Sequence, residues 1–111
     1  MILETKEVDK LLVASITAKE ANLENAGQFK QEMLSIIDKG HRYIALDFEQ
    51  VTYIDSSFLG AMVSCLKYAL GKSTDIYLIG MKKDILDLLR LIRMDKVFKI
   101  YATVNEAVSN I

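Results

Sequence analysis

The centre of this chain reads YIALDF at residues 43–48 and, a few residues later, DSSFLG at residues 55–60. The first run is nearly all apolar, which is typical of a strand that is covered on both faces of a sheet. The second run opens a segment without charge that reaches Leu66 and predicts a helix near 57–70. Two hydroxyls and one carboxylate therefore lie at a strand-to-helix turn. A helix start offers free backbone N–H groups and the positive end of its dipole.

The flanking sequence repeats this strand-and-helix unit in both directions. Asn22 is a plausible N-cap for a helix that stops before Gly40, and Thr103 with Glu106 forms a capping box for a closing helix. Because strands alternate with helices, the sequence predicts an α/β fold with a mixed, mostly parallel sheet of four to five strands and about four helices. The expected strands are 2–6, 11–16, 43–48, 76–79 and 97–101, and the expected helices are 23–39, 57–70, 83–93 and 103–110.

Length and composition limit the classes of protein to consider. A chain of 111 residues predicts one domain over 1–111, and 51% hydrophobic with 26% charged residues is the composition of a globular protein. The net charge is −1 and there is no basic run, so we expect no nucleic-acid partner. No apolar stretch approaches the ~20 residues of a membrane span, so we expect no membrane insertion.

Cysteine and histidine usage argues against redox and metal chemistry. The single cysteine, Cys65, excludes an internal disulfide and predicts a reducing, cytoplasmic environment. One histidine, one cysteine and scattered carboxylates do not make a metal site. We therefore expect no metal, no cofactor and no catalytic residue.

The helix near 57–70 has an unusual surface. Its predicted core stripe consists of Leu59, Met62, Val63, Leu66 and Leu70, while Phe58 and Cys65 on one flank are expected to fill the core. No charge occurs between Asp55 and Lys67, although a solvated helix face normally carries Lys or Glu. We interpret the opposite face as a docking surface. Its residues are Gly60, Ala61, Ser64 and Tyr68.

An apolar strand followed by Asp-Ser-Ser-x-Leu-Gly at the start of an apolar helix resembles the STAS domain, the sulfate transporter and anti-sigma factor antagonist family. The similarity extends over essentially the whole chain in length, element order and closing amphipathic helix. Two positions differ from the family pattern. Phe58 stands where the family usually has glycine, and the family's Gly-x-Leu-Asp signature is absent at Ala18-Lys19-Glu20-Ala21.

The resemblance implies a small regulatory protein and not an enzyme. Stand-alone bacterial members bind an anti-sigma factor that is also a serine kinase, release its sigma factor, and are inactivated when that kinase phosphorylates the first serine of the motif. Carried over, the phosphoacceptor is Ser56, with Ser57 as the alternate, and Asp55 orients Ser56 or contacts the partner. The partners implied are the anti-sigma factor kinase and a phosphatase. From spacing alone, either serine could simply be a helix cap, and Asp55 could likewise be a cap or a partner of the helix dipole.

Two other functions remain open. The chain could be a STAS subunit that acts as a structural partner of a transport ATPase or a signalling scaffold, without a phosphorylation cycle. It could also be a nucleotide- or small-ligand-binding module that uses the helix start. The second is disfavoured because Ser56 to Gly60 lacks the glycine-rich pattern of a phosphate loop.

Overall fold

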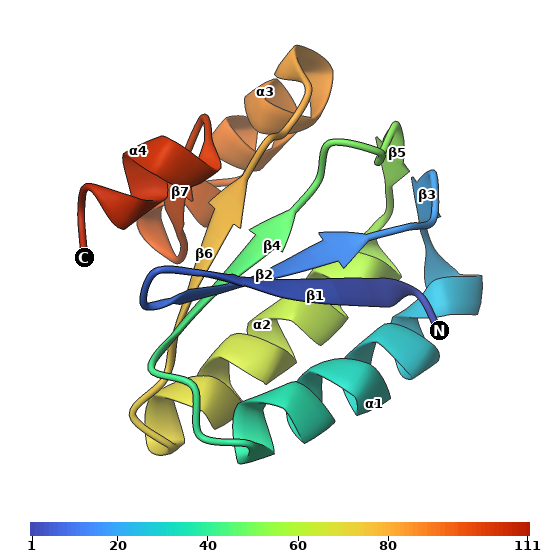
Figure 1. The fold of residues 1–111 in the computed structure, drawn as a ribbon. Helices are drawn as coiled ribbons and strands as arrows, with labels where there is room; N and C mark the ends of the chain where they lie inside the picture. Colours follow the sequence, from blue (N-terminus) through green and yellow to red (C-terminus); the bar gives the residue numbers. More distant parts are fainter.

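A computed structural model describes residues 1–111 as five strands in one sheet with helices on both faces (Figure 1). The strand order is β1-β2-β4-β6-β7, in which only the β1–β2 pair is antiparallel. This confirms the mixed, mostly parallel sheet. The strands are β1 (Leu3–Val8), β2 (Leu11–Ile16), β4 (Tyr43–Asp47), β6 (Asp75–Ile79) and β7 (Lys99–Tyr101).

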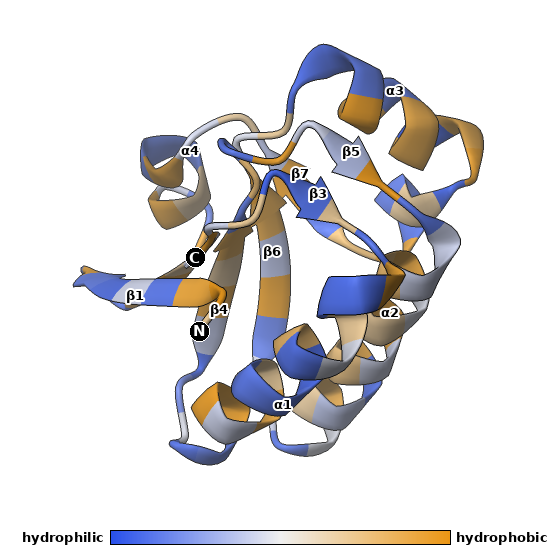
Figure 2. Cartoon of the chain, turned by 90° about the vertical axis from the view of Figure 1, so that its right-hand side faces the viewer, coloured by the Kyte–Doolittle hydropathy of each residue, from blue (hydrophilic) through white to orange (hydrophobic).

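The four expected helices are all present and are unequally distributed over the sheet. Helices α1 and α2 pack side by side on one face, whereas α4 lies on the other face (Figure 2). Residues of α3 join the same core cluster as α1 and α2. The helices are α1 (Leu23–Asp38), α2 (Ser56–Gly71), α3 (Lys83–Leu91) and α4 (Val104–Val108), with a short 3₁₀ turn η1 (Met94–Lys96).

The core has two parts, one on each face of the sheet. The larger part fills the space between the sheet and α1, α2 and α3, and the smaller part lies beneath α4. Alternate residues of a strand point to opposite faces, so β2 and β4 supply apolar side chains to both parts. This explains why the run at 43–48 is nearly all apolar. The largest fully buried side chains include Phe29, Phe48, Phe58 and Phe98.

A second, two-stranded sheet lies beside the central one and was not expected. Strand β3 (Glu20–Ala21) pairs in parallel with β5 (Tyr53–Ile54), and neither segment was among the expected strands. The pairing continues on both sides, since Thr52 N donates to Lys19 O at 2.8 Å and Asp55 N donates to Ala21 O at 3.0 Å. The β3–β5 pair therefore holds the start of α1 next to the start of α2.

Several predicted ends of elements were wrong by one or two residues. Helix α3 ends at Leu91 because Arg93 adopts a left-handed conformation with φ of 65° and a 3₁₀ turn follows. Strand β7 consequently starts only at Lys99. At the beginning of the chain, β1 continues to Val8, and a two-residue turn with Asp9 at φ of 54° leads directly into β2.

Candidate functional site

The Asp-Ser-Ser turn lies at the carboxyl end of the sheet, by which we mean the end at which the parallel strands terminate. It is organised by the Asp55 carboxylate. Its Oδ1 accepts a hydrogen bond from Phe58 N at 3.0 Å and so caps α2, while its Oδ2 accepts one from Leu23 N at 2.9 Å and so holds the first residue of α1. One side chain thus satisfies N–H groups at the starts of two helices, although Leu23 is 32 residues from Asp55 in sequence.

The two serines are the first two residues of α2 and are not its cap. Asp55 holds the N-cap position, so the capping role considered for Ser56 and Ser57 is wrong. Ser56 is exposed and Ser57 is half-buried. The Ser56 hydroxyl is therefore accessible at the positive end of the α2 dipole, and it is not required as a cap.

Two large apolar side chains beside this turn were missed by sequence reasoning. Leu23 is 71% exposed and its backbone N–H is bound to Asp55, and Tyr53, two residues before Asp55 in β5, is 52% exposed. The exposed carboxylate side chains Glu20 and Glu24 flank Leu23 in sequence. The exposure of Leu23 could have been predicted from the sequence. Leu23 directly follows the N-cap Asn22, but it falls outside the apolar stripe that faces the core from its helix.

The buried face of α2 differs from the predicted stripe. Met62 and Leu66 are buried as expected, but Leu70 is 57% exposed, and Leu59 and Val63 are only half-buried. The face is rotated because α2 packs against α1 on one flank as well as against the sheet. The buried residues of α2 are Phe58, Met62, Cys65, Leu66 and Ala69.

Phe58 and Cys65 fill the core, as expected. Phe58 is fully buried, and its ring lies 4.4 Å from that of Phe29 on α1, measured between centroids. The residue that replaces the family's usual glycine therefore points inward and leaves the outer surface of the turn unchanged. Cys65 is also fully buried, and burial raises the pKa of its thiol to about 11, so it stays protonated at neutral pH.

The predicted docking residues on α2 do not share one environment. Gly60 is exposed, and Ala61 and Ser64 are half-buried. Tyr68 is exposed at its edge, but its hydroxyl donates to Asp38 Oδ1 of α1 at 2.6 Å. Tyr68 also lies twelve residues beyond Ser56, which is roughly 18 Å along a helix. The structure thus brings Ser56, Ser57 and Gly60 together and leaves Tyr68 at the far end of α2.

No three His, Cys, Asp or Glu side chains come together in a way that could hold a metal ion. None of the helices combines the length and the apolar character that crossing a bilayer requires.

Comparison with known proteins gives one consistent match. The STAS domain family model matches residues 3–107. A Thermotoga maritima protein provisionally named an anti-sigma factor antagonist is 32% identical over 107 residues, which cover 96% of this chain and 94% of the relative. A crystal structure of such a protein from Thermotoga maritima has a TM-score of 0.85 at 29% identity and covers 97% of this chain and 92% of that chain.

The fold is also that of a more distant protein. The Bacillus cell fate determinant SpoIIAA, solved in its phosphorylated form, has a TM-score of 0.70 at 16% identity, and the match covers 97% of each chain. At this identity the likeness concerns the fold alone.

Proposed function

The chain belongs to the STAS domain family, and from that premise we propose that it is an anti-sigma factor antagonist. Its unphosphorylated form binds an anti-sigma factor that is also a serine kinase, and this binding releases a sigma factor. The protein acts by binding and not by catalysis, in the cytoplasm where sigma factors act. Phosphorylation of Ser56 ends the interaction, and a phosphatase restores it.

The observation that carries the proposal is the place of Ser56. It is the exposed first residue of α2 in a chain that is 32% identical to a protein named for this role. Because Asp55 already caps the helix, a kinase can modify Ser56 without removing a structural hydrogen bond. Ser57, the alternate acceptor, is half-buried and less accessible.

The proposed interface is centred on the turn and includes the two apolar side chains beside it. Ser56, Ser57 and Gly60 form its polar and small-residue part, and Leu23 and Tyr53 are its apolar anchors. Exposed aromatic and aliphatic side chains of this kind supply much of the binding energy at protein interfaces. Ala61 and Ser64 extend the surface along α2, Asp55 holds the turn through its two backbone hydrogen bonds, and Tyr68, at the far end of α2, lies outside the proposed interface.

Charge explains how phosphorylation would end binding. A phosphate adds about −1.5 to −2 charges, next to the Asp55 carboxylate and close to Leu23, whose side chain favours an apolar partner surface. The complex would have to desolvate this charge without a cation from this surface to balance it. A loss of ~3 kcal/mol weakens binding by more than a hundredfold. No large conformational change is needed.

The phosphosite can be tested by mass. The wild-type chain, Ser56→Ala and Ser57→Ala are each incubated with the cognate kinase and Mg-ATP, and their intact masses are measured. We expect one phosphate on the wild type and on Ser57→Ala, and none on Ser56→Ala. A phosphate on Ser56→Ala would refute the assignment. In binding assays, Ser56→Ala should retain affinity and Ser56→Asp should lose it, because a carboxylate carries part of the phosphate's charge.

The docking surface can be tested with two equivalent substitutions on one helix. Neither Gly60 nor Gly71 has an atom within 4 Å of the position that a Cβ would take, so Glu can be placed at either site without a clash. Gly60→Glu, four residues after Ser56, should weaken partner binding at least tenfold without lowering the melting temperature. Gly71→Glu, at the opposite end of α2, should leave affinity unchanged. Equal effects of the two variants on affinity would place the interface elsewhere.

A further inference from the structure

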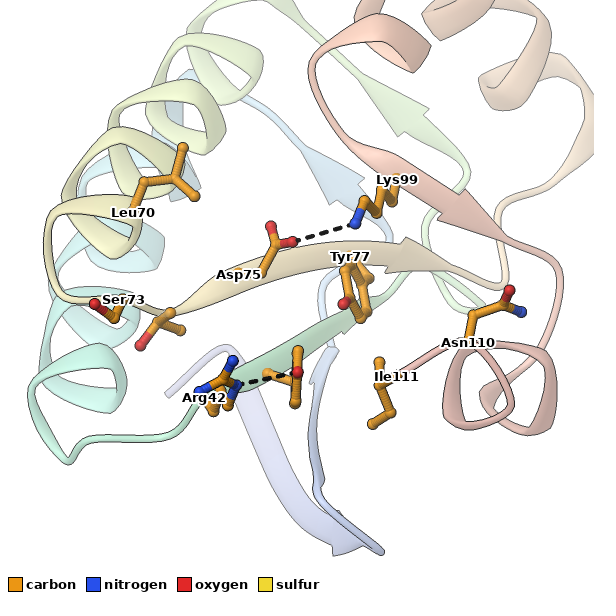
Figure 3. Close-up of a pocket in the computed structure, with 10 residues that line it drawn as sticks. Arg42, Leu70, Ser73, Asp75, Tyr77, Lys99, Asn110 and Ile111 are labelled. Carbon is orange, nitrogen blue, oxygen red and sulfur yellow. Dashed lines mark hydrogen bonds and ion pairs between the residues drawn. The ribbon is translucent and has the colours of Figure 1, made fainter.

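A cavity of about 400 Å³ lies at the amino end of the sheet, where the parallel strands begin (Figure 3). Ser56 does not line it. The starts of β4 and β6, the end of α2, β7 and the last residues of the chain contribute to its wall. The family relationship assigns no role to this place. The side chains that matter here are Arg42, Tyr43, Leu70, Tyr77, Lys99 and Ile111.

Two cations lie at this cavity against tyrosine rings. The Arg42 guanidinium is 5.5 Å from the centroid of Tyr43, and its Nε donates to the Tyr43 hydroxyl at 3.1 Å. Lys99 Nζ is 5.7 Å from the centroid of Tyr77 and 3.8 Å from Asp75 Oδ2. Contacts of this kind hold the cationic groups near the cavity and leave donors available.

The side-chain charge of the lining is positive. Asp75 is its only acidic side chain, and it pairs with Lys99, whereas Arg42 forms no ion pair with a carboxylate. Arg42 is therefore the cation of the lining that no carboxylate side chain balances. Burial raises the pKa of Tyr77 to about 12, so its phenol is neutral at pH 7 and adds no negative charge.

Apolar surface is exposed at the same cavity. Leu70 is 57% exposed and Ile111 is 36% exposed, and both line the cavity. The rings of Tyr43 and Tyr77 stack with their centroids 6.0 Å apart and form an aromatic part of the wall. Pockets for small organic ligands combine apolar walls with a few placed polar groups in this way.

We propose that this cavity binds a small organic monoanion with an aromatic or aliphatic body. The anionic group, a carboxylate or sulfonate, pairs with Arg42 and Lys99, and the body packs against Leu70, Ile111 and Tyr43. One anionic group matches the one cation of the lining that forms no ion pair, Arg42, whereas the second charge of a dianion would lie beside Asp75 without a free cation to balance it. The proposal is independent of the role of Ser56.

The test uses anilinonaphthalene sulfonate, an aromatic monoanion, and phenylnaphthylamine, which has the same rings without the sulfonate. Binding of each to the folded full chain is followed by amide NMR at neutral pH. We expect saturable binding of the sulfonate with a Kd below about 1 mM, and shifts that cluster at Tyr43, Thr74 and Lys99. The neutral compound should bind at least about tenfold more weakly, because it lacks the charge-assisted hydrogen bonds.

Variants separate the cavity from other surfaces. Arg42→Gln and Lys99→Gln should each weaken sulfonate binding about tenfold, and Leu70→Ser several-fold, with unchanged melting temperatures. Lys67→Gln removes an exposed cation of α2 outside the cavity and should have no effect. Shifts that cluster instead at the exposed Leu91 of α3, equal affinity for the two compounds, or no effect of both cation variants would overturn the proposal.

Discussion

The carboxyl and amino ends of the central sheet differ in how they use their charged groups. At the carboxyl end, Asp55 binds backbone N–H groups with both oxygens and fixes the starts of two helices. At the amino end, Arg42 and Lys99 lie over tyrosine rings, and only Lys99 is paired with a carboxylate. At the carboxyl end the charged group is used to hold the backbone, and the exposed side chains are small or apolar. At the amino end the charged side chains themselves are exposed.

This difference indicates what each end can bind. A surface whose carboxylate is already satisfied suits a protein partner, because docking desolvates few unpaired charges. A hollow with one unbalanced cation suits a small anion. It also indicates that, at each end, substitutions can change the stability of the fold without changing binding, and the reverse.

The first comparison uses the two ends of α2. Phe58→Ala should lower the free energy of unfolding by about 3–5 kcal/mol, because it removes a fully buried ring that contacts Phe29. Leu70→Ala, at an exposed position on the same helix, should change it by less than about 1 kcal/mol. Urea denaturation measures both. A small effect of Phe58→Ala would mean that the ring does not hold the start of α2 against α1.

The second comparison concerns the Asp55 carboxylate. Asp55→Ala removes the cap of α2 and the hydrogen bond to Leu23 N and should cost about 2 kcal/mol, whereas Asp55→Asn keeps one acceptor oxygen and should cost about 1 kcal/mol. Ser56→Ala should stay within about 0.5 kcal/mol. Amide exchange should accelerate at Leu23 in Asp55→Ala but not in Ser56→Ala. If Asp55→Ala is as stable as Ser56→Ala, the carboxylate does not join the two helices.

The third comparison concerns pH and the amino end of the sheet. Burial raises the pKa of Tyr77 to about 12, above the value near 10 of an unfolded chain. The stabilisation from the neutral phenol is therefore complete below about pH 10 and is lost as the pH rises towards 12. Tyr77→Phe should reduce this alkaline loss of stability, and Tyr53→Phe, at an exposed position, is the matched control. Identical alkaline profiles for the wild type and Tyr77→Phe would contradict the shift.

Local sequence signals predicted the elements well. Apolar periodicity located four helices, and the capping residues Asn22 and Thr103 both accept the expected backbone hydrogen bonds. These signals are reliable because periodicity and capping depend on residues within one or two turns of each other. The position of the serine turn between strand and helix follows from the same information.

Signals that depend on a distant neighbour were missed. The stripe of α2 was expected to include Leu70, but α1 packs along one flank of that helix and rotates its buried face. Both serines and Asp55 were candidate caps of α2, and Asp55 takes that position. Its second bond, to the N–H of Leu23 32 residues away, was not foreseen. Strands β3 and β5 are two residues each, too short for a periodic pattern to appear.

The sequence by itself thus determined the α/β class, the order of the elements and the exposed hydroxyl at the start of α2. Each of these depends on the residue types of one continuous segment. Only the tertiary structure decided that Asp55 joins two helices, that Leu23 and Tyr53 flank Ser56, and that Arg42, Leu70 and Lys99 meet at one cavity. Segments far apart in the chain become neighbours only through the crossovers of a parallel sheet, and no local pattern encodes which of their side chains will meet.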